Sequence, residues 1–330
     1  MELVLSLCLL SLPASTTGKN NDVQDWLNHG GNMLNRRFAD KETMISPETA
    51  SRLRLKWKFN AGQDISPTHA IFDGTVYFPS WDGYIYAVKA SNGGLVWKKK
   101  LQQLTGLNST KAVSNIDPNI TVSRTTPVIA YDLLIFGMSG PAYVVAVKRS
   151  NGELVWLTQL DKHPKAIITM SGTYYNGSVF FCYISSSYAP QLAKGSFVKL
   201  NARTGKILWR TYMLPNNLGQ RGEYTGVAIW GSSLSIDIRR NHVYIGTGNL
   251  YSAPKNVRNC QERKNNRTDM PSTDECVEPE NHSVSILALD LDTGKVKWFN
   301  QLGGYDVWFF ACNNVPNPKC PPSPKLDADF

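Results

Sequence analysis

Four copies of one short pattern constrain the fold of this chain more than any other feature of its sequence. The copies are AVKASNGGLVW (87–97), AVKRSNGELVW (146–156), KLNARTGKILW (199–209) and ALDLDTGKVKW (288–298). In each copy a glycine lies four residues before the final tryptophan, and Asn or Thr directly precedes that glycine. Glycine supplies the positive φ that a tight turn requires. The pattern therefore predicts two antiparallel strands joined by a hairpin, here called the docking module.

The distances between the modules predict how these strand pairs are assembled. Successive module tryptophans are 59, 53 and 89 residues apart, and further strand pairs lie upstream, as in GTVYFPSWDGYIYAV (74–88) and NHVYIGTGN (241–249). Each repeat has room for a four-stranded sheet, and radial repetition of such sheets is a β-propeller. The long amphipathic helices of a parallel α/β fold are missing. We expect an all-β propeller of about four blades, with Trp57 as a fifth docking tryptophan from a blade whose other strands lie elsewhere.

Composition excludes several classes of protein. The chain has 330 residues, of which 42% are hydrophobic and 18% charged, as in globular proteins. It has no glycine triplets, no sustained heptads and no apolar run near the length of a membrane-spanning helix. The net charge is +9, but basic residues are scattered and their longest cluster is Lys98–Lys100. We expect no nucleic-acid partner. Attraction to an acidic polysaccharide and an ordinary solvated basic surface both stay open.

The start of the chain predicts a secreted protein. Leu3–Leu12 form an apolar stretch followed by small residues up to Gly18, which is typical of a signal peptide over 1–18 before a propeller over 19–330. Glu2 is unusual at the start of such a segment, and a buried N-terminal helix is the alternative. Five N-glycosylation motifs agree with secretion. They begin at Asn108, Asn119, Asn176, Asn266 and Asn281.

The six cysteines fit an oxidising compartment. Cys8 falls within the predicted signal peptide. Two pairs are close enough in sequence to close short disulfide loops, Cys260 with Cys276 and Cys312 with Cys320. Cys182 is left over in a strand-like run. Zinc is a poor alternative, because no CxxC or paired-His spacing accompanies these residues.

The module also resembles the repeat of a known family. The pattern A-x-D-x-x-T-G-x-x-x-W, best kept in residues 288–298, resembles the tryptophan-docking repeat of the quinoprotein dehydrogenases. The chain is similar to them over 24–330, especially to the polyvinyl-alcohol-dehydrogenase-like branch that plants also carry. DWLNHGGNMLNRRF (25–38) resembles that branch's opening W-x-x-x-G-x-x-x-x-x-R segment. The resemblance implies an eight-bladed ring with pyrroloquinoline quinone (PQQ) on its axis. We therefore expect a C-terminally incomplete ring whose open blade edges favour self-association.

The resemblance implies candidate residues for the quinone. ITMSGTYYNGSVFF (168–181) resembles the strand whose hydroxyl groups bind PQQ, which assigns Thr169 and Ser171 to its carboxylates. Arg124 is a candidate to pair with a carboxylate through its guanidinium. The alternatives are ordinary strand hydroxyls for the first two and a surface arginine for the third.

TGVAIWGSSLSIDIRRNHVYIGTGN (225–249) is the strongest local match. In the family a W-G pair precedes a strand and then G-T-G-N. By this resemblance Trp230 is the aromatic floor under the quinone, and Asn249 gives an amide oxygen to calcium, which prefers oxygen ligands. A core tryptophan is the alternative for Trp230.

Two positions depart from the family pattern. Where a calcium-ligating Glu is expected, the chain reads ISSSYAPQ (184–191), so Ser186 is left to touch the quinone and calcium should bind weakly. The general base of the family is an Asp beside a Trp. Here Asp306 lies two residues before Trp308 and is the candidate base.

Two functions compete. The first is a secreted oxidoreductase that oxidises alcohols or polyhydroxylated polymers with PQQ and calcium, in the cell wall or apoplast if the source is a plant. The second is a non-catalytic extracellular propeller that binds glycans or proteins. Neither function requires a membrane span.

Overall fold

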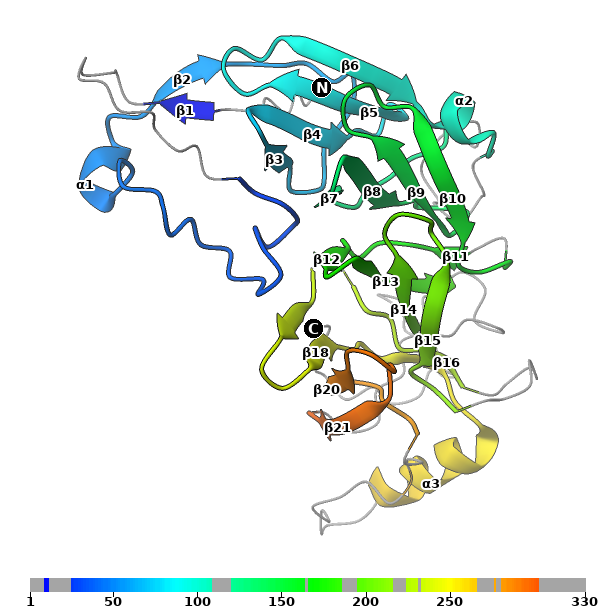
Figure 1. Cartoon of the computed structure of the whole chain (residues 1–330). Helices are drawn as coiled ribbons and strands as arrows, with labels where there is room; N and C mark the ends of the chain where they lie inside the picture. The colour runs from blue at the N-terminus through cyan, green and yellow to red at the C-terminus, as the bar shows by residue number, and fades with distance from the viewer. Residues whose placement is uncertain are drawn as a thin grey trace, which may run out of the picture.

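The computed structural model describes residues 9–11, 25–108, 120–163, 166–185, 195–215, 224–230, 233–265, 276 and 280–302. Four antiparallel sheets fan out in an arc around a common centre (Figure 1). These sheets are the blades, numbered 1 to 4 along the chain. The all-β propeller expected from the repeats is confirmed.

Blades 1 and 2 each contain four strands in chain order. Those of blade 1 are β3 (Ala70–Phe72), β4 (Thr75–Pro79), β5 (Tyr84–Lys89) and β6 (Leu95–Lys100). Those of blade 2 are β7 (Val128–Ala130), β8 (Leu133–Gly137), β9 (Tyr143–Lys148) and β10 (Leu154–Gln159). The short helix α2 (Leu101–Thr105) follows β6.

Blades 3 and 4 follow the same plan with additions. Blade 3 contains β11 (Ala166–Ile167), β12 (Thr173–Tyr175), β13 (Ser178–Ser185), β14 (Ser196–Asn201) and β15 (Ile207–Tyr212). Blade 4 contains β17 (Ser235–Asp237), β18 (His242–Gly246), β20 (Ser285–Asp290) and β21 (Val296–Gln301). A separate two-stranded sheet pairs β16 (Thr225–Gly226) with β19 (Leu250–Ser252).

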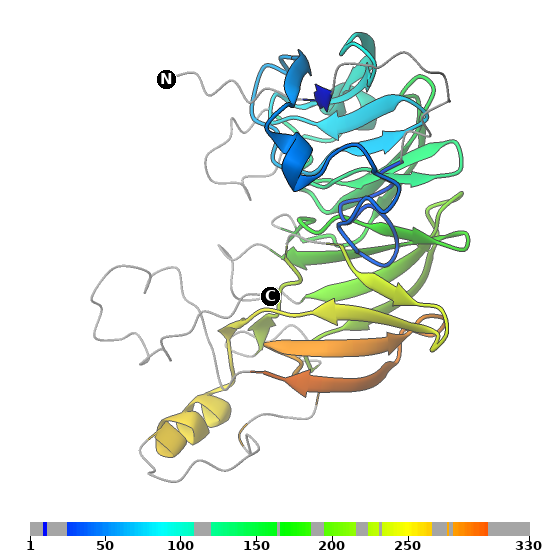
Figure 2. The ribbon, with the colours of Figure 1, turned by 90° about the vertical axis from the view of Figure 1, so that its left-hand side faces the viewer.

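The blades give the molecule two unlike faces. Each blade starts at its innermost strand, and its last strand lies on the outside of the arc (Figure 1). Because neighbouring strands of a blade are antiparallel, successive connections alternate between two sides. One side holds the connections between blades and those from the second to the third strand within a blade, together with helix α3 (Lys255–Asn265). Tight turns lie on the opposite side (Figure 2). We call the first side the loop face and the second the turn face.

Neighbouring blades are joined by a tryptophan that packs on the hairpin glycine of the next module. The glycines at 93, 152, 205 and 294 all have φ between +71° and +72°. A Cβ on Gly93 would lie 2.6 Å from Trp57, and one on Gly205 would lie 2.5 Å from Trp156. Trp97 and Trp209 cover the other two glycines in the same way. Each glycine is thus required twice, for its backbone angle and for the ring against it.

One detail of the expected docking is wrong. Among the described residues the four docked rings are Trp57, Trp97, Trp156 and Trp209, whereas Trp298 is 45% exposed on the outer strand β21. Trp298 ends the last described blade, so no described glycine covers it. Trp57, on β2 (Arg54–Trp57), docks on blade 1 from outside the four sheets, as the sequence predicted.

An extended N-terminal segment, residues 25–38, ties the innermost strands together. Trp26 exchanges two backbone hydrogen bonds of 2.8 Å with Ile71 of β3, and the Leu27 carbonyl accepts from the Ile129 amide of β7. The side-chain amide of Asn28 donates to the Thr173 hydroxyl at 3.4 Å, and the Met33 carbonyl accepts from the backbone amide of Ile236 in β17 at 2.9 Å. Together these hydrogen bonds reach the innermost strand of each of the four blades. The segment therefore fixes the blades at the centre of the arc.

Several remaining predictions have clear outcomes. Cys260 and Cys276 form a disulfide with a Cα–Cα distance of 5.6 Å, and Cys182 is a buried free thiol in β13, as expected. The sequence did not predict α3, which carries Cys260. Residues 9–11 form β1 (Leu9–Ser11), paired with β2, so the alternative of a helix there is wrong. Cys312 and Cys320 lie outside the described residues. No described helix is long and apolar enough to cross a membrane.

A short helix α1 (Pro47–Ala50) precedes β2. Ser46 caps it by accepting from the Thr49 amide, while the Thr49 hydroxyl accepts from the Ser46 amide. This reciprocal pair satisfies two of the amides that a helix start leaves without partners.

Candidate functional site

Five of the seven candidate residues lie on the loop face. Arg124 precedes β7, Thr169 and Ser171 precede β12, and Trp230 precedes β17. Asn249 lies between β18 and β20, in the other kind of connection that reaches this face. The propeller topology alone thus places residues from 124 to 249 on one side of the molecule. Ser186 and Asp306 lie outside the described residues.

The two blades that carry the hydroxyl groups are joined by Ser171. Its Oγ accepts a hydrogen bond of 2.9 Å from the Thr126 amide, and both residues are buried. The hydroxyl hydrogen of Ser171 is not used by this bond and is available to an acceptor. Thr169 is 5% exposed and lies two residues away. Arg124, two residues before Thr126, is exposed, and its guanidinium group stays positively charged.

Trp230 lies in a small apolar cluster beside these hydroxyls. It is partly buried and packs against Ile167, Ile184, Ala228 and Tyr251. Ile167 is two residues before Thr169, so the tryptophan of blade 4 reaches the hydroxyl segment of blade 3. The ring is partly buried, so part of its surface is exposed.

Asn249 is buried and hydrogen-bonded through both its backbone and its side chain. It is 3% exposed, its carbonyl accepts from the Val227 amide at 2.8 Å, and its Nδ2 donates to the Leu250 carbonyl at 3.2 Å. Val227 and Gly226 both have positive φ. The backbone of Asn249 is thus held by the neighbouring connection, and its side chain is held by the carbonyl of the next residue.

Glycines allow these connections to approach closely. The Gly195 amide donates to the Gly226 carbonyl, and a Cβ on Gly195 would overlap the Val227 carbonyl oxygen. A Cβ on Gly137 would overlap Ile168, whose amide donates to the Met138 carbonyl. These connections of the loop face are therefore in direct backbone contact.

Two histidines on the loop-face side of the core were not predicted. His29 lies 3.4 Å from the Thr126 hydroxyl through Nδ1. Burial and the nearby Arg37 lower the pKa of His29. His69, directly before β3, packs on Phe78, and burial lowers its pKa to about 4. His29 lies within the W-x-x-x-G segment, so this motif could have predicted that it is close to the candidate site.

The donors that the described residues offer fit an anionic planar ligand better than a metal. Two buried hydroxyls, a guanidinium and a partly open indole suit a flat group with carboxylates. No group of three His, Cys, Asp or Glu that could hold a metal occurs within the described residues. The quinone-binding roles of these residues and the calcium role of Asn249 stay predictions.

The chain belongs to the family whose repeat model, PQQ_2, is described as outer membrane protein assembly factor BamB and matches residues 48–300. Polyvinylalcohol dehydrogenases from Pseudomonas sp. and from Sphingopyxis sp. strain 113P3 are similar to it in sequence. Their identities are 25% and 27%, over 92% and 87% of this chain. The alignments cover 44% and 42% of those two proteins, so the chain spans less than half of their length.

Solved structures show the same fold. The quinohemoprotein alcohol dehydrogenase ADHIIG from Pseudomonas putida HK5 matches with a TM-score of 0.65 at 21% identity, over 84% of this chain and 40% of that one. A europium-containing methanol dehydrogenase matches with a TM-score of 0.64 at 19% identity, over 87% of this chain and 50% of that one. At these identities the likeness concerns the fold. It confirms that the four sheets are blades of a β-propeller.

Proposed function

We propose that this chain forms half of a PQQ-dependent oxidoreductase that acts on alcohols or polyhydroxylated polymers outside the cell. One observation carries the proposal. Five residues chosen from sequence patterns far apart in the chain lie on the loop face, in the three connections between blades and in the connection between β18 and β20. The similarity to polyvinylalcohol dehydrogenases supports the same class of substrate.

Each described residue has a role that its environment supports. Arg124 pairs with a carboxylate of the quinone, and the Thr169 and Ser171 hydroxyls donate to the others. The partly open face of Trp230 supports the flat ring system. Asn249 offers its amide oxygen to calcium, a weak ligand when unaided by carboxylates. Bound PQQ would supply the acceptor for a hydride.

Proton removal is assigned to the sequence candidate Asp306. A general base must lie within hydrogen-bond reach of the substrate hydroxyl and be deprotonated at the working pH. Ser186 is assigned a contact with the quinone. Both roles rest on the resemblance of their sequence segments to the family.

The competing function is a propeller that binds glycans or proteins without catalysis. It is favoured by the lack of a carboxylate cluster among the described residues. Calcium would then have only neutral protein oxygens in a partly desolvated site, where a missing charge matters most. The two functions differ in whether the chain retains the quinone.

Reconstitution with PQQ and calcium, followed by desalting and dye-linked alcohol oxidation, separates the two functions. We expect the unsubstituted protein to retain quinone absorbance after desalting. Trp230→Phe should weaken the affinity for PQQ about tenfold. Trp298→Phe is the matched control, because Trp298 is exposed on β21, away from the predicted site. Absence of quinone absorbance in the unsubstituted protein would favour the binding module. Equal losses in the two variants would contradict the role of Trp230.

A further inference from the structure

A polar pocket with two tyrosines lies between blades 2 and 3, apart from the candidate quinone site. It has a volume of about 480 Å³. Its walls come from the end of β10 and the residues that follow it, from β13, and from the end of β15. They are formed by Gln159, Leu160, Asp161, Lys162, Tyr183, Arg210 and Tyr212. Because β10 and β15 both end at the loop face, the pocket opens on the same side as the candidate site.

Arg210 organises the pocket. Its Nη2 donates to the Leu160 carbonyl of the neighbouring blade at 2.8 Å, and its Nη1 lies 3.4 Å from the Tyr212 hydroxyl. The guanidinium carbon lies 5.5 Å from the ring centre of Tyr183 and 6.0 Å from that of Tyr212. The Nε of Arg210 is buried and has no partner within the described part of the chain. A buried donor without a partner is costly unless a ligand or water satisfies it.

The two tyrosines play different parts. Tyr183 is 3% exposed, and burial raises its pKa to about 12, so its hydroxyl stays protonated as a fixed wall of the pocket. Tyr212 is 51% exposed. An exposed ring beside a cleft offers an apolar surface on which the C–H groups of a ligand can stack.

The charges select the kind of ligand. Arg210 and Lys162 are cationic, Asp161 is anionic, and Gln159 has both a donor and an acceptor. A purely anionic ligand would meet the Asp161 carboxylate, and a purely cationic one would meet Arg210 and Lys162. A ligand that both donates and accepts at many points satisfies this wall best, and hydroxyl groups do so.

We propose that this pocket binds a neutral polyhydroxylated chain, with its C–H face on Tyr212 and its hydroxyls paired with Arg210, Asp161 and Gln159. Blade 3 separates the pocket from the Trp230 cluster, because Tyr183 and the cluster residue Ile184 are consecutive in β13 and point to opposite faces of the sheet. The use of the pocket as a substrate subsite rests on the proposed function. Its ability to bind does not.

The test uses the full chain without cofactor, so that failure of quinone chemistry cannot imitate failure of binding. Titration calorimetry with cellohexaose and with a vinyl alcohol oligomer distinguishes a glycan from a synthetic-type polyol, and hexagalacturonate is the anionic probe. We expect saturable binding of at least one neutral probe. Tyr212→Asn should raise its Kd about tenfold, which corresponds to roughly 1.4 kcal/mol.

Tyr131→Asn is the matched control. Tyr131 is also an exposed tyrosine stacked with an arginine, 3.7 Å from Arg203, but it lies in a turn on the opposite face. Its φ of +58° suits Asn, so the substitution should leave the fold and the Kd unchanged. The proposal is overturned if neither neutral probe binds, if only hexagalacturonate binds, or if Tyr212→Asn binds as tightly as the unsubstituted protein. Thermal unfolding of both variants checks that they are folded.

Discussion

The interface between blades 2 and 3 and the interface between blades 3 and 4 use the same ring for different purposes. In the first, Trp156 packs on Gly205 and its Nε1 donates to the Ala202 carbonyl at 3.0 Å. In the second, Trp209 packs on Gly294, but its Nε1 is buried without a partner among the described residues. Stacking is conserved between the two interfaces, and the hydrogen bond is not.

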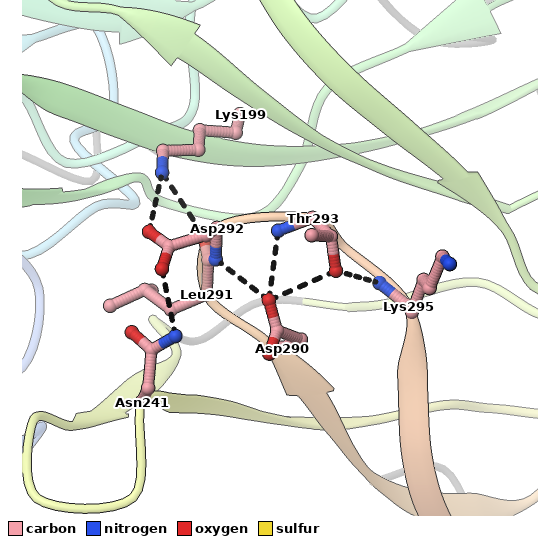
Figure 3. Close-up of polar contacts among 7 residues, drawn as sticks. All are labelled: Lys199, Asn241, Asp290, Leu291, Asp292, Thr293 and Lys295. Atoms are coloured by element: carbon pink, nitrogen blue, oxygen red, sulfur yellow. Dashed lines mark hydrogen bonds and ion pairs between the residues drawn. The ribbon is translucent and has the colours of Figure 1, made fainter.

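Lys199 takes over the bond that Trp209 does not make. Its Nζ donates to the Leu291 carbonyl at 2.9 Å, at the position equivalent to Ala202, and lies 3.9 Å from Asp292 (Figure 3). Asp292 also accepts from Asn241 at 2.9 Å. The turn itself is held by Asp290, which accepts from the Thr293 hydroxyl at 2.9 Å.

A single substitution in the repeat explains the difference. The residue across the hairpin from the tryptophan is Ala87, Ala146 or Ala288 in three modules and Lys199 in the other. Trp156, which faces Ala146, donates to the carbonyl of the next blade, whereas at the equivalent carbonyl of Leu291 the donor is Lys199. The comparison teaches that the docking ring is defined by its packing on glycine, since its hydrogen bond can be replaced.

The largest effect is expected from adding a methyl group beneath the ring. Gly205→Ala and Gly294→Ala should each lower the unfolding free energy by about 3 kcal/mol, because each adds backbone strain and overlaps a tryptophan. Urea unfolding measures this. Gly74→Ala is the control for strain alone, since Gly74 has φ +67° and no atom within 4 Å of its Cβ position, and should cost about 1 kcal/mol. Similar losses at 74 and 205 would show that ring stacking does not matter.

Next in size is the difference between the two tryptophans. Trp156→Phe removes ring volume and leaves the Ala202 carbonyl without its donor, whereas Trp209→Phe removes the volume alone. We expect Trp156→Phe to be more destabilising by about 1 kcal/mol, the usual net value of one hydrogen bond. Equal losses in urea unfolding would mean that Trp209 has a partner after all.

A double-mutant cycle sharpens the same comparison. Lys199→Ala makes the third module like the others and frees the Leu291 carbonyl for the Trp209 N–H. Trp209→Phe should then cost about 1 kcal/mol more in the Lys199→Ala protein than in the natural one. Ala146 and Trp156 already have this arrangement in the preceding module. Additive losses would show that the indole cannot reach the carbonyl.

The smallest expected effect is a dependence on alkaline pH. Burial lowers the pKa of Lys199 from its ordinary value of 10.5. Between the lowered and the ordinary value the unfolded chain binds more protons, so stability rises with pH across that window. Lys199→Met lacks this contribution. Urea midpoints measured as the pH is raised toward 10.5 should therefore rise in the natural protein relative to Lys199→Met, and parallel curves would contradict the buried position of the amine.

Sequence determined those parts of the protein that repeat. The glycine and tryptophan of each module act within a hairpin and on its neighbour, so their spacing alone predicted the hairpins, the four blades and the docking role of Trp57. It also predicted the disulfide of Cys260 and Cys276, because two cysteines so close in sequence form a short loop. These features depend on short-range geometry that a linear pattern records directly.

Tertiary structure decided everything that depends on residues distant in sequence. Only the fold shows that Lys199 displaces the Trp209 hydrogen bond, that residues 25–38 reach all four innermost strands, and that Arg210 and Tyr212 share a pocket with the residues after β10. The candidate residues of the loop face were found by resemblance, but their contact through Ser171 and Thr126 required the packed blades. The reason is physical: a side chain's partner across a blade interface is set by the radial placement of whole sheets, which no local spacing encodes.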